Sequence, residues 1–299
     1  MSRKLWAVAL LFALVAAACS STQSADPPSC TTAEPDRTTH TYRDIDGVDP
    51  NLTSLDVWSG ENPADCPVLV WVHGGSWQAG DKSTRLTTDK ASYFNELGFV
   101  FVSVNYRLAS DTNDIRWPDF GDDVAAAVQW VRDNAEDIGV DSDEITLMGH
   151  SSGAHLVSIV GTSPSLLPRV GADRSDVACV ISLDSVTHDL TDEQPWETDI
   201  IDLSFPDDAA KVDGSPTLQA LEVGDSSDAP AFLIVTRGRD ARLDSAARLG
   251  DTINDTGGSA AVVDVSPYDH GEVSSQLGLP GEELVTPAVE SFVQSCSGI

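Results

Sequence analysis

The segment ITLMGHSSGAHL (residues 145–156) restricts the fold of this chain more than any other part of the sequence. A short apolar run with strand character ends at Gly149, and a helical spacing of apolar residues resumes after Gly153. Between them stands Ser151, separated from each glycine by one residue. A tight strand–serine–helix turn brings the flanking backbone close together, so that only glycine fits, and it lifts the hydroxyl above the strand end. The segment therefore predicts a nucleophilic serine.

The rest of the chain alternates between strand and helix patterns. Continuous apolar runs at 67–75 and 99–106 are typical of strands buried on both faces. The clearest amphipathic helix lies at 120–139, and two alternating segments at 39–45 and 53–59 indicate an antiparallel pair. This order predicts an α/β fold with a mainly parallel sheet, helices on both faces, and ligands bound at the carboxyl ends of the strands.

Chemically able side chains follow the expected strands in the order Ser, Asp, His, which is the order of a hydrolase triad. His270, in the loop after the last strand, is the predicted general base for Ser151, and His188 is the rival candidate. Asp240 is expected to accept the imidazole Nδ1–H and to stabilise the imidazolium, with Asp244 as the alternative.

The segment HGGSW (residues 73–77) is expected to supply part of an oxyanion hole. Successive glycines let the backbone turn and direct N–H groups at a substrate carbonyl oxygen. We predict Gly75 N–H and Ser76 N–H as donors, together with Ser152 N–H at the start of the following helix. Trp77 either lines the substrate pocket or packs under this loop.

Taken in order, the segments VHGGSWQAGDKS, VNYRL, GHSSGAHL, GRDARLD and DHGE resemble the carboxylesterase branch of the α/β-hydrolases. The likeness is to the feruloyl-esterase-like (BD-FAE) and kynurenine-formamidase-like groups, and it covers about residues 40–295. It implies a sheet of about eight strands and a small cap region. The segment DSVTHDL (184–190) departs from the SGVYDL of these enzymes, and Ala241 departs from the usual hydrophobic residue or proline after the acid. The acidic interval 188–229 is expected to be a cap-like insertion that governs substrate choice.

These features predict a catalytic domain at 38–299 that hydrolyses carboxylic esters of small molecules through an acyl-enzyme. An amidase or formamidase with the same triad is the alternative, and a catalytically inactive binding lipoprotein is a third reading. Neither a metal nor an organic cofactor is expected. A nucleic-acid partner is not expected, because the formal net charge of −31 would repel phosphates. The sequence does not predict an oligomeric state.

The first residues read as a targeting segment. A basic start and an apolar run predict a signal peptide at 1–18, and VAAAC resembles a lipobox in which Cys19 becomes the lipidated first residue. Residues 19–37, rich in Ser, Thr and Pro, are expected to form a flexible tether. The protein is therefore expected outside the cytoplasm, touching the membrane only through its lipid anchor, with free secretion as the alternative.

Four cysteines remain beside Cys19, an even number that suggests two disulfides in an oxidising compartment. Their spacing fits no zinc pattern. Three connectivities are open, and we favour Cys30–Cys66 together with Cys179–Cys296.

Overall fold

A computed structural model describes residues 30–61, 63–192, 197–238 and 240–297. The predicted signal peptide and Cys19, the predicted lipidation site, lie outside the described residues. The predicted tether at 19–37 is partly described, and its last part is held in place. Cys30 is bonded to Cys66, and Thr32 N–H donates to the Asn95 carbonyl. A free tether therefore extends no further than residue 29.

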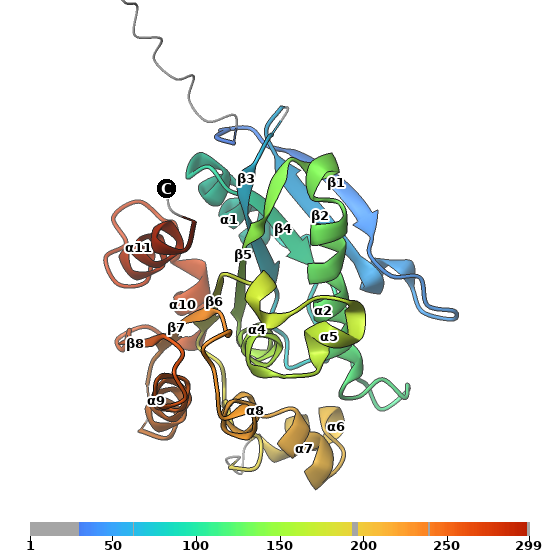
Figure 1. Ribbon diagram of the computed structural model, residues 1–299, viewed down its shortest axis with the longest axis vertical. Coiled ribbons are helices and arrows are strands. Elements are labelled where there is room, and N and C mark those ends of the chain that lie inside the picture. The colour runs from blue at the N-terminus through green and yellow to red at the C-terminus, as the bar shows by residue number, and fades with distance from the viewer. Residues whose placement is uncertain (1–29, 62, 193–196, 239, 298–299) are drawn as a thin grey trace, which may run out of the picture.

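In the described part of the chain, eight strands form one sheet in the order β1-β2-β4-β3-β5-β6-β7-β8 (Figure 1). The strands are β1 (Asp36–Thr41), β2 (Ser54–Ser59), β3 (Cys66–Val72), β4 (Val100–Val104), β5 (Val140–His150), β6 (Cys179–Leu183), β7 (Ala231–Thr236) and β8 (Ala260–Asp264). Pairing is antiparallel for β1–β2 and β2–β4 and parallel from β4 to β8. The predicted α/β architecture is confirmed.

Helices cover both faces of the sheet. They are α1 (Arg85–Glu96), α2 (Asp119–Asp133), α3 (Ala135–Ile138), α4 (Ser152–Thr162), α5 (Leu166–Val170), α6 (Thr198–Ser204), α7 (Asp208–Asp213), α8 (Pro216–Val223), α9 (Asp240–Asp255), α10 (His270–Ser275) and α11 (Thr286–Ser297), with 3₁₀ turns at Pro50–Thr53 and Arg174–Asp176. Among the described helices, none combines the length and apolarity that crossing a bilayer requires.

Alternate residues of the central strands supply two separate cores. On β3, Val68, Val70 and Val72 pack with apolar residues of α2, α4, α5, α8 and α9. Leu69 and Trp71 point to the other face and pack with residues of α1, α10 and α11. Because both sets are buried, β3 has no polar alternation, which is why its sequence reads as a continuous apolar run.

The acidic interval between β6 and β7 contains more regular structure than its sequence indicates. Helices α6, α7 and α8 lie here, below the sheet in Figure 1. Phe205, at the end of α6, is buried against Trp77, Trp117 and Phe120. This aromatic packing holds the interval to the main domain together with hydrogen bonds, such as that from Trp117 N–H to the Ser204 carbonyl at 2.9 Å.

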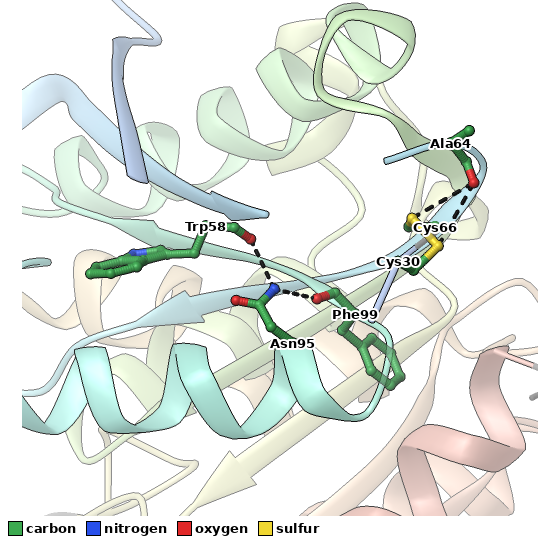
Figure 2. The surroundings of a disulfide bond; sticks show 6 residues. All are labelled: Cys30, Trp58, Ala64, Cys66, Asn95 and Phe99. Atoms are coloured by element: carbon green, nitrogen blue, oxygen red, sulfur yellow. Dashed lines mark hydrogen bonds between the residues drawn. A yellow bond between two sulfur atoms is a disulfide. The ribbon is translucent and has the colours of Figure 1, made fainter. Parts of the chain in front are cut away.

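Both favoured disulfides are present. Cys30–Cys66 ties the start of the described chain to β3, and both sulfur atoms lie near the Ala64 carbonyl oxygen, at 3.7 and 3.6 Å (Figure 2). In the same region, Asn95 Nδ2 of α1 donates to the carbonyls of Trp58 and Phe99. Cys179–Cys296 ties the first residue of β6 to α11.

The two disulfides are expected to stabilise the fold unequally. They close loops of sequence separation 36 and 117, which by the chain-entropy relation correspond to about 4 and about 5 kcal/mol. C179A/C296A should therefore lose more free energy of unfolding in urea than C30A/C66A. Wild type in dithiothreitol serves as the control for loss of both. If both double variants were as stable as oxidised wild type, the disulfides would not stabilise the fold by closing these loops.

Candidate active site

The turn between β5 and α4 presents Ser151 at the carboxyl edge of the sheet. Ser151 has φ 58° and ψ −123°, a left-handed conformation that a non-glycine residue adopts only under constraint. A Cβ on Gly149 would lie 2.3 Å from the Gly153 carbonyl oxygen, and one on Gly153 would lie 2.1 Å from that of Val72. The predicted reason for both glycines, close backbone approach, is confirmed.

His270 meets this serine from the start of α10. Its Nε2 lies 2.9 Å from Ser151 Oγ. The helix start is fixed by Asp269, whose side chain accepts from Glu272 N–H at 2.8 Å while the Glu272 carboxylate accepts from Asp269 N–H at 2.7 Å. This capping box sets the position from which the imidazole reaches the serine.

A second histidine holds the backbone beneath the first. His150 Nε2–H donates to the carbonyl of His270 at 2.8 Å, and the two rings lie 4.5 Å apart. Burial, together with the neighbouring His270, lowers the pKa of His150 to about 4. His150 is therefore neutral near pH 7 and keeps the N–H that supports its neighbour's backbone.

Among the described residues, the carboxylate that contacts His270 is that of Asp184, a residue that the sequence did not single out as the acid. Asp184 Oδ2 lies 2.6 Å from His270 Nδ1. Asp184 directly follows β6, whereas Asp240 begins α9 after β7, and the side chain of Asp240 lies outside what the structure describes. The alternative, Asp244, is exposed to solvent.

Asp184 is fully buried and remains ionised through its contacts. Burial alone would raise the pKa of this carboxyl, but the hydrogen bond and charge of His270, the charge of Arg242 and the hydrogen bond of Arg237 together lower it. A buried carboxylate with a lowered pKa can hold the Nδ1–H of an imidazole and favour its protonated state.

The strand arrangement explains why β6 can supply this group. In the parallel pair β6–β7, Leu183 lies opposite Val235, and Asp184 N–H donates to the Val235 carbonyl at 2.8 Å. The residue after β6 thus lies beside the end of β7, where the acid was predicted. The sequence did carry a signal for Asp184. This residue is the first of the segment DSVTHDL, which departs from the SGVYDL of the similar enzymes.

Two other histidines, His188 and His155, form hydrogen bonds away from Ser151. His188, the rival base, is buried with its Nε2 3.1 Å from Ser182 Oγ, and burial lowers its pKa to about 3. His155 Nε2–H donates to the Gly214 carbonyl. Among the described histidines, only His270 is recorded within hydrogen-bond distance of Ser151 Oγ.

The HGGSW segment lies directly against the serine turn. A Cβ on Gly74 would be 3.0 Å from that of Ser151. Gly75 and Ser76 have φ values of 132° and 58°, which turn the backbone sharply after β3. Among the described hydrogen bonds, the N–H groups of Gly75, Ser76 and Ser152 donate to no protein acceptor. In the described part of the chain, three backbone N–H groups beside Ser151 are thus candidate oxyanion donors.

Neighbouring aromatic rings keep this loop in place. The ring of His73 stacks on that of Tyr106 at 4.5 Å, and Tyr106 Oη–H donates to the His73 carbonyl at 3.1 Å. Trp77 is 3% exposed and packs edge-on against His155 and Phe205. It therefore packs under the loop, which is one of the two roles expected of it.

A groove of about 410 Å³ gives access to the site. Ser151 and His270 lie on its wall with the glycine loop. Its remaining wall is formed mainly by residues around the start of α1 and by one residue of α10, namely Asp81, Thr84, Leu86, Thr87 and Ser274. The groove brings together a serine hydroxyl, an imidazole and backbone N–H groups, which are the kinds of group that acyl transfer uses.

The fold is that of the α/β-hydrolases, as solved structures of similar fold show. The structure of brefeldin A esterase, a bacterial homologue of human hormone-sensitive lipase, superimposes with a TM-score of 0.69 at 19% identity, covering 91% of this chain and 78% of that one. A truncated carbohydrate esterase from gut microbiota gives 0.68 at 18% identity, covering 91% and 99%. At these identities the likeness concerns the fold.

Sequence relatives place the chain more narrowly. The BD-FAE family model matches residues 55–197, which confirms the resemblance to the carboxylesterase branch. Esterase LipQ of Mycobacterium tuberculosis is 38% identical over 130 residues, 42% of this chain and 30% of LipQ. Carboxylesterase NlhH of the same species is 29% identical over 237 residues, 74% of this chain and 70% of NlhH. The chain thus spans under a third of LipQ and most of NlhH.

Gly149 offers a direct test of the turn. In G149A the new methyl group would lie 2.3 Å from a carbonyl oxygen of rigid backbone, so we expect a loss of about 3 kcal/mol in the free energy of unfolding. G271A is the matched control, because its methyl group would meet nothing closer than 3.5 Å. Urea unfolding of both variants measures the difference, and equal stabilities would contradict the close approach.

Proposed function

We propose that the protein is a serine-dependent carboxylic ester hydrolase in which Ser151, His270 and Asp184 form the triad. The observation that carries the proposal is the continuous chain of contacts from Ser151 Oγ to His270 Nε2, 2.9 Å, and from His270 Nδ1 to Asp184 Oδ2, 2.6 Å. This arrangement can remove the proton of a hydroxyl at neutral pH, which a serine alone does not lose.

The proposed reaction has two halves. Ser151 Oγ attacks the ester carbonyl carbon while His270 Nε2 takes its proton, and the carbonyl oxygen becomes an oxyanion. His270 then returns the proton to the leaving alcohol as the C–O bond breaks and an acyl-enzyme forms. Water, activated by the same imidazole, attacks the acyl-enzyme, releases the carboxylic acid and regenerates Ser151. Asp184 holds the imidazole tautomer throughout.

Backbone donors stabilise the oxyanion in this proposal. The N–H groups of Gly75, Ser76 and Ser152 are free, and the first two belong to the loop that touches the Ser151 turn. Each donor of this kind contributes about 3 kcal/mol to transition-state stabilisation. These N–H groups are already in place before the reaction, so they stabilise the negative charge of the oxyanion without rearrangement.

Small-molecule esters are the proposed substrates. Relatives of this chain bear the names esterase and carboxylesterase, which supports an ester, whereas one relative, named a probable N-octanoylanthranilate hydrolase, supports the amidase alternative. The groove beside Ser151 holds about 410 Å³, enough for a small ester. We assign the interval 188–229 as the cap-like insertion in the catalytic domain 38–299.

The protein is further proposed to work outside the cytoplasm, exported by the signal peptide 1–18 and anchored through lipid on Cys19. Two disulfides support an oxidising compartment. The disulfide at Cys30 leaves ten residues, 20–29, between the anchor and the first fixed point of the domain.

Three variants test the triad on p-nitrophenyl acetate. S151A should abolish turnover, and D184N should lower kcat by about 10³–10⁴-fold, because the imidazole loses the carboxylate that fixes its tautomer. D240N is the matched control and should keep activity within about threefold of wild type. Circular dichroism checks that each variant is folded. If D240N were inactive and D184N active, Asp240 and not Asp184 would be the acid of the triad.

A bacterial host with lipoprotein export tests the anchor. Cells expressing the full chain and fed radiolabelled palmitate should yield labelled protein in the membrane fraction, and C19S should yield unlabelled protein. Labelling of C19S, or absence of label on wild type that is exported and active, would exclude the lipid at Cys19.

A further inference from the structure

The carboxylate of Asp184 is contacted almost entirely through one oxygen. Oδ2 lies 2.6 Å from His270 Nδ1, 2.8 Å from Arg237 Nε and 3.2 Å from Arg242 Nη1. The Arg237 contact is a hydrogen bond, and the Arg242 contact is an ion pair without hydrogen-bond geometry. Among the described residues, Oδ1 has no hydrogen-bond partner. Two cations thus share the oxygen that binds the imidazole.

Both arginines come from the segment that follows β7. Arg237 is the first residue after β7, and Arg242 lies in the first turn of α9. The neighbouring strand β6 ends at Leu183, so Asp184 projects directly beside them. The segment after β7, where the acid was predicted, therefore supplies two guanidinium groups instead. Both contact Asp184, which follows the neighbouring strand β6.

Removing either arginine would leave a buried negative charge with less compensation. Asp184 is 0% exposed, and each arginine side chain is 21% exposed, so the ion pairs are only partly screened by water. A cation close to an imidazole opposes its protonation, and a cation on the carboxylate also weakens the pull of that carboxylate on the imidazole proton. Both effects of each arginine therefore disfavour the protonated form of the His270 imidazole.

Two neighbouring histidines and one lysine each keep a single charge state between about pH 5 and pH 7. From β5, His150 has its pKa lowered to about 4, and His188 beyond β6 to about 3, mainly by burial, so both are neutral above pH 5. From α1, buried Lys90 donates to the Ser274 carbonyl at 2.7 Å, and burial lowers its pKa to about 8, so it is charged below pH 7. The N-terminal residues of α10 itself, Asp269 and Glu272, are engaged in their capping box.

We infer that Arg237 and Arg242 are positioning residues that hold Asp184 against His270 and oppose protonation of the imidazole, extending hydrolysis to lower pH. This inference rests on the proposed triad. It makes the arginines part of the acid's own site, although neither contacts Ser151 or His270 among the described interactions. Their guanidinium groups also line a separate cavity of about 720 Å³ between residues 186–192 and α9.

That cavity supplies a matched control. Arg248 lines it as well, but its Nη2 pairs with Asp192 at 2.7 Å and it does not contact Asp184. R248M therefore removes the same charge from the same cavity without altering the carboxylate of the triad. R237K keeps a positive charge beside Asp184 and serves as the conservative rescue.

The experiment is the pH profile of kcat/KM from pH 4.5 to 8 on p-nitrophenyl acetate. Wild type should lose activity on acidification as the imidazole binds a proton. In R237M and R242M the midpoint of this loss should move up by about one pH unit, while kcat at pH 8 falls less than tenfold. R237K and R248M should keep the midpoint within about 0.3 unit of wild type.

Two results would overturn the inference. One is an R237M or R242M that loses activity by the same factor at every pH with an unchanged midpoint, which is the signature of a merely structural role. The other is an R248M that shifts as much as R237M. If R237M fails to fold by circular dichroism, R242M carries the comparison. Active S151A and D184N would instead refute the proposed triad, so the two failures are distinguishable.

Discussion

The close packing of backbone against backbone at the carboxyl ends of β3 and β5 governs the rest of this structure. Helix α4 begins so near the sheet that the Gly153 position touches the Val72 carbonyl and the Gly149 position touches Gly153. Any side chain at either place would push the helix away. The same approach forces Ser151 into a left-handed conformation and raises its hydroxyl above the sheet edge. The strain at the serine is held by the packing on both sides of it.

A second constraint is electrostatic and concerns one carboxylate among many. The chain has 48 acidic residues against 17 Lys and Arg. Only a carboxylate that is buried and then compensated can keep its charge in a fixed geometry. Asp184 meets this condition, because it is fully buried between His270 and two arginines. A carboxylate at the surface, such as Asp244, is hydrated and offers no such fixed position.

Most of the fold could be predicted from the chain because its signals are local. The apolar run at 67–75 is the strand β3, and its lack of alternation follows from burial on both faces. The helix at α2 follows from its apolar spacing. The interval between β6 and β7 was harder, since α6, α7 and α8 are short and owe their position to tertiary contacts such as that of Phe205. Short helices are set by packing more than by propensity.

From the sequence alone, Ser151 and His270 could be paired and the need for the glycines around the turn could be predicted, and the structure brings the two side chains within 2.9 Å. These are tied to local backbone motifs, and each motif has one chemically able residue at its centre. Only the tertiary structure decided which carboxylate meets His270. The ends of β6 and β7 lie side by side, with Leu183 opposite Val235, and it is the residue after β6, Asp184, that contacts the imidazole. The resemblance to known enzymes favoured an acid after β7. The hydrogen bond is made by Asp184 after β6, because the packed sheet holds that side chain within reach of the imidazole.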